Sequence, residues 1–464
     1  MNEFQMDPDL LRERLSHAVL YREAGKITKS LGLIYEAQLP GASVGSLCRI
    51  LPSKDSKADS AIEAEVVGFR DKRVILMPFE EATGINNDSR VLLQKRDSTV
   101  QVGASLLGRV IDARGEPLDG KGPLFMGNKG TEQRSLYREP AHPLDRKLVN
   151  EPLDLGVRAI NGLLTCGKGQ RVGILAGSGV GKSVLLGMMA RRTVADVNVI
   201  ALVGERGREV REFIESDLGP EGLKRSVVIV ATSDKSPLLR MRAAFLATTI
   251  SEYFRDHGLD VLMLMDSLTR FCMAQREIGL SMGEPPTSRG YTPSVFSIMP
   301  KILERAGTRA GAGSITGLYT ILVEGDDIDD PIGDSARSIL DGHWVLSRKL
   351  AQRNQFPAID ILASASRVMR AVTTPEHTAW ASKLREWMAA YNQAEDLINI
   401  GAYVRGSNAR IDTSIVVQEK ILDFLKQGIG DAANFSDSLA NMRAIVQSAE
   451  AYSASMQQMP KQQK

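Results

Sequence analysis

A glycine-rich turn between an apolar run and a helix-forming run is the feature that most constrains this chain. It lies within RVGILAGSGVGKSVLLGMM, residues 171–189. Because glycine has no Cβ atom, such a turn can wrap closely enough for several backbone N–H groups to point into one concavity, where they bind phosphate oxygens. The pattern predicts a strand, a phosphate loop and a helix, with a nucleoside triphosphate as the ligand.

The predicted loop follows the consensus G-x-x-x-x-G-K-[ST] except at its first position, which is Ala176. From the mouth of the helix, Lys182 can reach the β- and γ-phosphates, and the hydroxyl of Ser183 can complete the shell of a Mg²⁺ ion. The residues predicted to bind ATP are Gly177, Ser178, Gly179, Val180, Gly181, Lys182, Ser183 and Val184. The alternative is a glycine-rich turn that binds nothing, and the intact G-K-S between a strand and a helix argues against it.

Length and charge limit the class of protein. A chain of 464 residues is too long for one core, so two or three domains are expected. The 58 basic and 56 acidic residues leave a formal net charge of +2, which favours no polyanionic partner. The absence of a long apolar run and of a signal-peptide pattern predicts a cytoplasmic protein. The three scattered cysteines and five isolated histidines predict neither a disulfide framework nor a zinc site.

Residues 1–24 are predicted to contain a short amphipathic helix. Asp7 suits an N-cap position, and Leu11, Leu15 and Val19 recur at helical spacing. The helix either packs on its own domain or docks a partner protein, and the sequence leaves both alternatives open.

Short β-rich runs fill residues 25–97 and predict a small β-barrel or sandwich. Its strands carry aliphatic rather than aromatic residues, which favours a structural role over nucleic-acid binding. Residues 101–130 are rich in glycine and proline, and predict a linker with a hairpin that leads into the nucleotide domain.

Beyond the phosphate loop, apolar strands alternate with helices. We expect strands at residues 197–203, 226–231, 260–265, 316–323 and 358–363. This alternation predicts an α/β fold with a mainly parallel sheet covered on both faces. Ligands of such sheets bind at the carboxyl ends of the strands.

Two of these strand ends carry candidate catalytic residues. The run VLMLMD ends at Asp266, where a carboxylate can hold Mg²⁺ through water. Glu205 and Arg206 follow another strand, and they can polarise the attacking water and hold a phosphate oxygen. Glu209 is a second candidate for the base, and spacing alone does not choose between the two acids. Either acid can instead form a surface ion pair in the first turn of a helix.

Several long motifs resemble the ATPases of the bacterial flagellar type III export apparatus. They are GILAGSGVGKSVLLGMMAR, VGERGREVREFI, SPLLRMRAA, MDSLTRFCMAQREIGLSMGEPP, GYTPSVFSIMPKILERAG, VEGDDIDDPIGDSARSILDGHWVLSR and QAEDLINIGAYVRGSN. The resemblance covers residues 24–410, and the family is related to injectisome ATPases and to the subunits of rotary F-type ATP synthases. It implies a RecA-like P-loop core at 98–372, between a β-barrel at 25–97 and a C-terminal helical domain at 373–464.

The resemblance also implies roles for single residues. In the G-E-R motif the first acid of the family is the catalytic carboxylate, which selects Glu205 and gives Arg206 a γ-phosphate role. Phe356 in QFPAID matches the aromatic residue that stacks on adenine, with a core aromatic as the alternative. Arg367 in ASASRV matches the arginine finger inserted into the site of the neighbouring subunit.

As a whole, the resemblance implies a homohexameric ring that hydrolyses Mg-ATP to energise flagellar protein export, peripherally at the membrane export apparatus. The implied partners are a coiled-coil negative regulator at the N-terminal helix, a central stalk protein, export-gate membrane proteins and chaperone–substrate complexes, with no nucleic acid. One alternative is an injectisome ATPase, which the flagellar-like phosphate-loop motif disfavours. A ring-shaped RNA or DNA translocase would need a nucleic-acid-binding barrel and basic pore loops. A catalytically silent subunit is disfavoured by the G-E-R triplet beside G-K-S.

Overall fold

The computed structural model describes residues 24–52, 61–125, 130–323 and 330–458. The chain divides into two compact units, residues 1–99 with 281–283 and residues 100–280 with 284–464. The amphipathic helix expected in residues 1–24, including Leu11 and Leu15, lies outside the described residues, which begin at Ala24.

The first unit contains a closed barrel with the strand order β1-β2-β5-β4-β3-β6. Its strands are β1 (Ala24–Leu31), β2 (Ile34–Gln38), β3 (Leu47–Leu51), β4 (Ile62–Arg70), β5 (Arg73–Pro78) and β6 (Arg90–Lys95). Alternate side chains point inward, and Ile27, Ile50, Val66, Leu76 and Val91 pack together in its interior. Pairing of β1 with β6 closes the sheet and leaves no free edge. The predicted β-barrel is confirmed.

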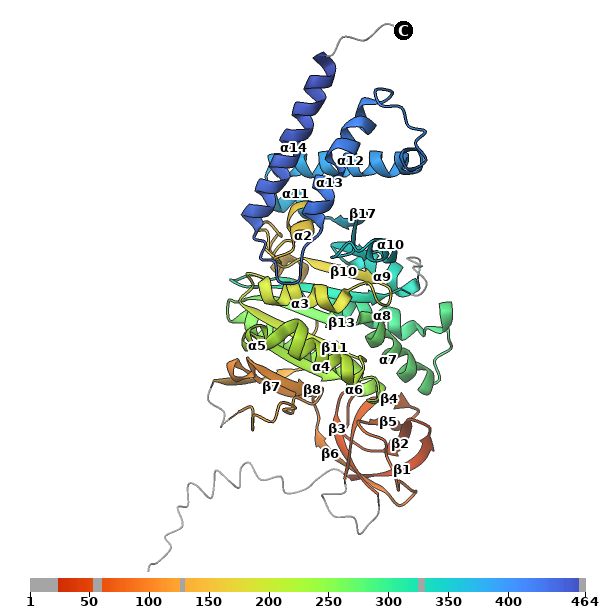
Figure 1. Ribbon diagram of the computed structural model, residues 1–464. Helices are drawn as coiled ribbons and strands as arrows, with labels where there is room; N and C mark the ends of the chain where they lie inside the picture. The colour runs from red at the N-terminus through yellow and green to blue at the C-terminus, as the bar shows by residue number, and fades with distance from the viewer. Residues whose placement is uncertain (1–23, 53–60, 126–129, 324–329, 459–464) are drawn as a thin grey trace, which may run out of the picture. The chain divides into compact units, whose positions relative to one another are not determined.

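The second unit is built on a nine-stranded sheet with the main order β17-β16-β10-β15-β13-β11-β12-β8 (Figure 1). The strands are β8 (Arg109–Asp112), β10 (Arg171–Ala176), β11 (Val197–Val203), β12 (Ser226–Ala231), β13 (Asp260–Asp266), β14 (Gly307–Thr308), β15 (Ser314–Leu322), β16 (Gly342–Leu346) and β17 (Ile359–Ser366). Strand β17 runs antiparallel to β16, and β14 runs antiparallel to β15. The other pairings are parallel, which confirms the predicted α/β fold with a mainly parallel sheet.

Two parts of this sheet differ from the sequence-based expectation. Strand β16 was not expected, because GHWVL contains glycine and histidine and lacks a continuous aliphatic run. Strand β8 lies in the stretch expected to be a linker, and it pairs with β12 at the edge of the main sheet. The expected hairpin is present there, since Leu118 N donates to Val110 O at 2.8 Å. Nearby, β7 (Thr99–Gly103) and β9 (Thr131–Ser135) form a separate two-stranded sheet.

Helices connect the strands of the main sheet and cover it (Figure 1). They are α2 (Arg158–Leu163), α3 (Lys182–Arg192), α4 (Gly207–Glu212), α5 (Gly219–Lys224), α6 (Pro237–Asp256), α7 (Leu268–Ser281), α8 (Pro293–Leu303), α9 (Pro331–Ile339), α10 (Arg348–Gln352) and α11 (Met369–Val372). The long helix α6 packs along β11, β12 and β13. Among the described residues, no helix is both long and apolar enough to cross a membrane.

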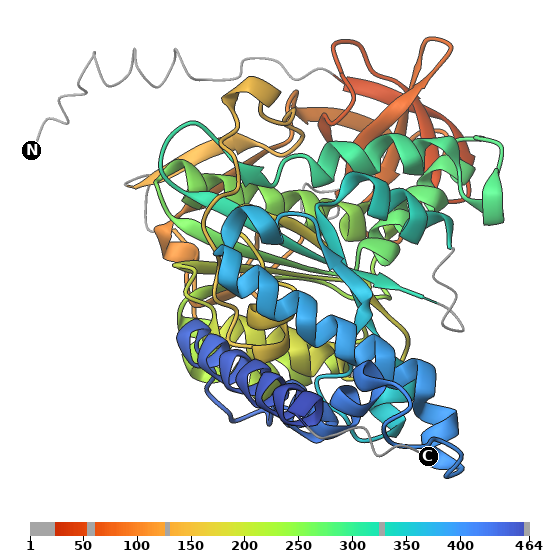
Figure 2. The same cartoon turned by 90° about the horizontal axis from the view of Figure 1, so that it is seen from above.

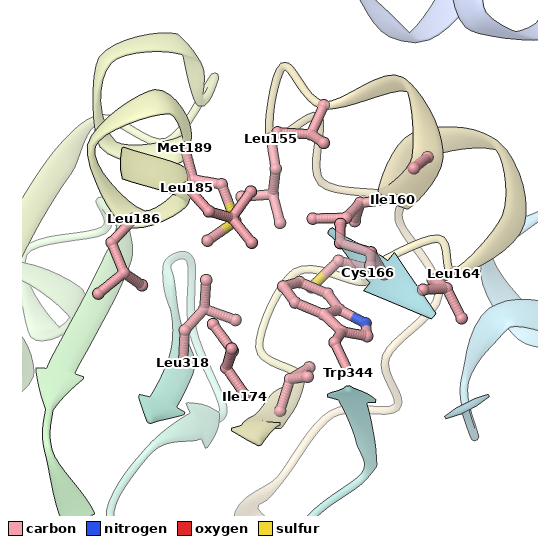
Figure 3. Close-up of a cluster of buried hydrophobic side chains, with 14 of the residues drawn as sticks. Leu155, Ile160, Leu164, Cys166, Ile174, Leu185, Leu186, Met189, Leu318 and Trp344 are labelled. Carbon is pink, nitrogen blue, oxygen red and sulfur yellow. The ribbon is translucent and has the colours of Figure 1, made fainter. Parts of the chain in front are cut away.

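A buried apolar cluster joins the phosphate-loop helix to the strands beneath it (Figure 3). Leu185 and Met189 of α3 lie close to Leu155 and above Ile174 of β10, and the Trp344 ring fills the space next to Cys166 (Figure 3). Each of these side chains is at most 2% exposed. This packing fixes the start of α3 over the end of β10, which positions the nucleotide site.

Three long helices follow the sheet: α12 (Pro375–Asn399), α13 (Ala409–Leu425) and α14 (Phe435–Gln458). They pack against one another and on α2 (Figure 2). Leu384, Ile421 and Met442 belong to the same buried cluster as Ile160 of α2. The helical layer and the nucleotide core therefore share apolar packing.

Candidate nucleotide site

The phosphate loop lies at the carboxyl end of β10 and leads directly into α3. Gly179 and Gly181 have φ values of 77° and 84°, a backbone region that residues with a Cβ rarely adopt. Among the described residues, no side chain caps α3, whose N-cap is Gly181. Its first backbone N–H groups are therefore available to an anion, and the helix dipole favours negative charge there. This geometry suits the phosphates of a nucleotide.

Lys182, Glu205 and Asp266 converge from three separate elements. The Lys182 ammonium forms an ion pair with Asp266 Oδ1 and lies 3.5 Å from Glu205 Oε1. The three side chains are 13%, 16% and 4% exposed. Burial acts to lower the pKa of Lys182, and the two carboxylates outweigh this effect and raise it. The ammonium is thus held charged between the two acids.

Glu205 is poised to titrate near neutral pH. Burial and the negative charge of Asp266 raise its pKa to about 7, against the opposing effect of Lys182. A side-chain hydrogen bond with Glu209 raises the pKa further. Gly204, with a φ of 73°, makes the sharp turn that brings Glu205 off the end of β11 toward the lysine. A carboxyl group with this pKa can accept a proton from water at physiological pH.

A hydroxyl on the neighbouring strand orients Asp266. Thr320 of β15 donates from Oγ1 to Asp266 Oδ1 at 2.7 Å, and both residues are buried. This bond joins β15 to β13, and β15 in turn pairs with β10, the strand of the phosphate loop. Sequence reasoning missed Thr320, although a threonine near the end of the largely apolar run TGLYTILV was a signal.

Two other predicted residues lie at the rim of the site. The Phe356 ring lies beside the phosphate loop, 3.4 Å from where a Cβ on Gly181 would stand, and its side chain is 41% exposed. The alternative of a core aromatic does not match that exposure. Arg206 is 82% exposed, and its Nη1 lies 3.8 Å from Glu209 Oε1. Its guanidinium is free to turn toward a bound ligand.

Arg367 does not join the other predicted residues. It follows β17, and its N–H donates to Asp341 O at 2.9 Å, next to the first residue of β16. Because β17 runs antiparallel to β16, this is the amino edge of the parallel sheet, whereas the phosphate loop lies at the carboxyl edge. Strand β10 has 6 residues, so the two edges of the sheet lie about 20 Å apart along it. Exposed Arg367 lines a cavity of about 380 Å³ at that opposite edge.

Comparisons with known proteins place this arrangement in a family. Residues 156–366 match the ATP synthase alpha/beta family, nucleotide-binding domain, and residues 373–444 match the T3SS EscN ATPase C-terminal domain. The chain is 52% identical over 425 residues to the flagellum-specific ATP synthase of Bacillus subtilis (strain 168), covering 92% of this chain and 95% of the relative. The chain belongs to the flagellar and type III secretion ATPases.

Another member of this ATPase family, the flagellum-specific ATP synthase of Salmonella typhimurium, is 50% identical over 435 residues, covering 91% of this chain and 94% of the relative. A solved structure of the same family is the assembled ATPase EscN in complex with its central stalk EscO, from the type III secretion system of enteropathogenic E. coli. Its TM-score is 0.83 at 46% identity, and the match covers 91% of this chain and all of that chain. Membership makes this chain an ATP-hydrolysing enzyme, and the predicted resemblance is confirmed.

Proposed function

We propose that the chain hydrolyses Mg-ATP to energise the type III export of flagellar proteins. The observation that carries this proposal is the convergence of Lys182, Glu205 and Asp266 in front of an uncapped phosphate-loop helix. The flagellum-specific relatives, at 52% and 50% identity over most of the chain, support the flagellar system as the setting.

The phosphate loop binds the triphosphate through its backbone N–H groups, and Lys182 turns from the two carboxylates to the β- and γ-phosphates. The donor set also suits a divalent cation, because the Ser183 hydroxyl and a buried carboxylate are hard oxygen ligands. Ser183 would hold Mg²⁺ directly and Asp266 through water. When bound, Mg²⁺ neutralises negative charge on the phosphate oxygens.

Glu205 acts on the attacking water in this proposal. Once Lys182 has moved to the phosphates, the Glu205 carboxylate orients a water molecule and accepts its proton as the water oxygen bonds to the γ-phosphorus. The bond from that phosphorus to the β,γ-bridging oxygen breaks, and ADP is the leaving group. Arg206 turns inward to hold a γ-phosphate oxygen. Phe356 stacks on the adenine ring and closes the other side of the nucleotide pocket.

Arg367 supplies a positive charge to the neighbouring chain. Its place at the amino edge of the sheet, away from the phosphate loop of its own chain, supports action across a subunit boundary. Such an arginine neutralises the charge that develops during phosphoryl transfer. Sites completed in this way join subunits head to tail, and a closed ring of six is the proposed assembly.

The proposed partners follow from the ring and its setting. The EscN structure with its central stalk EscO supports a stalk protein in the middle of the ring. We place a coiled-coil negative regulator on residues 1–24, and export-gate membrane proteins and chaperone–substrate complexes on the assembled ring. The ring sits peripherally at the membrane export apparatus, and we expect no nucleic acid to bind.

Copurification from the native cells tests the flagellar assignment. Tagged wild-type chain should bring flagellar export components with it, and Lys182→Ala should bring the same set while hydrolysing no ATP. A variant with Leu11→Asp and Leu15→Asp should lose the coiled-coil regulator alone, because charge on the apolar face prevents helix docking. Recovery of injectisome components without flagellar ones would instead show an injectisome ATPase.

A further inference from the structure

We propose that Asp341 is a positioning residue that holds the arginine finger Arg367 against the strand of the phosphate loop of the same chain. This inference rests on the proposed function, and it adds a residue that touches neither nucleotide nor metal. Asp341 precedes β16, at the edge of the sheet opposite the nucleotide.

The side chain of Asp341 is fixed on the first residue of β10. Its carboxylate accepts hydrogen bonds from Nε and Nη2 of Arg171 at 3.0 and 3.1 Å, and from the Arg171 backbone N–H at 3.1 Å. The Arg171 side chain is 14% exposed, and its Nη1 forms a further ion pair with Glu304. A two-pronged pair of this kind fixes both the position and the orientation of the carboxylate.

The backbone carbonyl of Asp341 is hydrogen-bonded to the backbone of the arginine finger, Arg367. Its carbonyl oxygen accepts the backbone N–H of Arg367 at 2.9 Å and the Nε2 of Gln170 at 3.0 Å. Gln170 Nε2 also donates to Ser366 Oγ at 3.2 Å, directly before the finger. Asp341 therefore links Arg171, where β10 begins, to the backbone of Arg367.

The Arg367 side chain also lies beside Asp341 and Arg171. Its Nη2 donates to Arg337 O at 3.0 Å, and it lines the cavity together with Arg171 and Asp341. Because the guanidinium ends a long flexible side chain, its reach depends on where the backbone is held. The other end of β10 is the phosphate loop, so a shift of this strand on nucleotide binding moves the finger offered to the neighbouring site.

The substitution Asp341→Asn tests this role because it removes the charge and half of the two-pronged pair while nearly preserving size. Misplacement of a reacting group by about 1 Å costs on the order of 10²-fold in rate. We expect a fall in kcat of that order, with ATP affinity and ring formation unchanged. A second variant, Arg171→Lys, keeps a charge yet cannot form the two-pronged pair, and should show a smaller fall.

Mixed rings separate a positioning role from a structural one. In a mixture of Lys182→Ala chains, which donate a finger, and Arg367→Ala chains, which hold an intact nucleotide site, activity arises only where the two meet. Adding Asp341→Asn to the finger-donating chain should abolish most of that activity. Adding it to the nucleotide-site chain should leave the activity unchanged, because the finger of that chain is already absent.

Three outcomes would overturn the positioning role. They are equal losses of ATPase activity in both placements, a loss confined to the nucleotide-site chain, and no loss in either placement. The parent mixture, without any change at Asp341, is the control for the proposed function. Its failure to recover activity in demonstrated mixed rings would contradict the action of Arg367 across the boundary. A parent mixture that works while the Asp341 asymmetry is missing contradicts the positioning role alone.

Discussion

Glu205 and Asp266 share the Lys182 ammonium, and their environments differ. Asp266 is fixed by the Thr320 hydroxyl, whereas Glu205 is less deeply buried and shares a side-chain hydrogen bond with a second acid, Glu209. Two carboxyl groups with different surroundings suit two different tasks, one holding the cation and one accepting a proton. At the scale of single residues, we therefore expect the protonation of Glu205 to govern the rate.

Replacing Glu205 by glutamine tests its assignment as the base. The amide fills the same space yet cannot accept a proton from water, so we expect hydrolysis to fall by about 10²- to 10⁴-fold. ATP binding, measured by titration calorimetry, should be retained. The matched variant Glu209→Gln should keep most activity, and the reverse pattern would assign the base to Glu209.

The raised pKa of Glu205 predicts a pH dependence. Below about pH 7 the carboxyl group holds its proton and cannot accept another, so kcat/KM should rise as pH increases through about 7 and level off above it. Glu209→Gln should move the midpoint to lower pH, because the hydrogen bond and charge of Glu209 raise the pKa of Glu205. A profile that is flat between pH 6 and 8 would contradict the prediction.

At the scale of elements, the order of strands brings the acids to the phosphate loop. Strand β15 separates β10 from β13, and Thr320 is its polar link to Asp266. The loop between β16 and β17 carries Phe356, whose carbonyl accepts the backbone N–H of Gln427 at 2.9 Å. The segment that follows α13 is thereby tied to the side of the site where adenine is proposed to bind.

Thr320→Val should damage the site more than the fold. The change removes one of two donors to Asp266 Oδ1 and leaves the Lys182 ammonium as its partner. Loss of a hydrogen bond to a charged group costs roughly 1–3 kcal/mol of stability, and it lets the carboxylate rotate. We expect a higher Mg²⁺ requirement and roughly tenfold lower kcat. Thr248→Val is the matched control, since that buried hydroxyl bonds to Ala244 O of its own helix. It should lower the unfolding temperature with little effect on hydrolysis, and equal kinetic losses in the two variants would contradict a specific role for Thr320.

Phe356→Ala should weaken ATP binding selectively. Stacking of a base on an aromatic ring contributes about 1–3 kcal/mol, so the Kd for ATP should rise roughly 10- to 100-fold. Phe356→Tyr keeps the ring face and should bind ATP normally. Binding of inorganic triphosphate, which has no base, should be equal in all three proteins, and a parallel loss there would show that the ring acts on the loop instead.

Local patterns in the sequence predicted much of the fold and the nucleotide loop. Buried parallel strands such as VNVIALV are continuous apolar runs, and G-K-S after a strand is a local signal. Strand β16 and Thr320 have weak local signals, because their roles come from neighbours far along the chain. The pairing of Asp341 with Arg171 joins residues 170 positions apart, and no spacing in the sequence indicates it.

At the scale of the whole molecule, one chain holds both halves of the proposed composite site at opposite edges of one sheet. The phosphate loop and its two acids lie at the carboxyl edge, and Arg367 lies at the amino edge. If Arg367 acts as proposed, a chain with this arrangement completes its site only by meeting a copy of itself. Activity per chain should accordingly rise with protein concentration as rings form.

Recovery of hydrolysis on mixing two inactive variants tests this account most directly. Arg367→Ala keeps its nucleotide site and Lys182→Ala keeps its finger, so mixed rings should regain partial ATPase activity at the boundaries where the two halves meet. Each variant alone should stay inactive at every concentration, while Arg367→Ala still binds ATP. Mixed rings that are shown to form and yet remain inactive would contradict an arginine finger acting between chains.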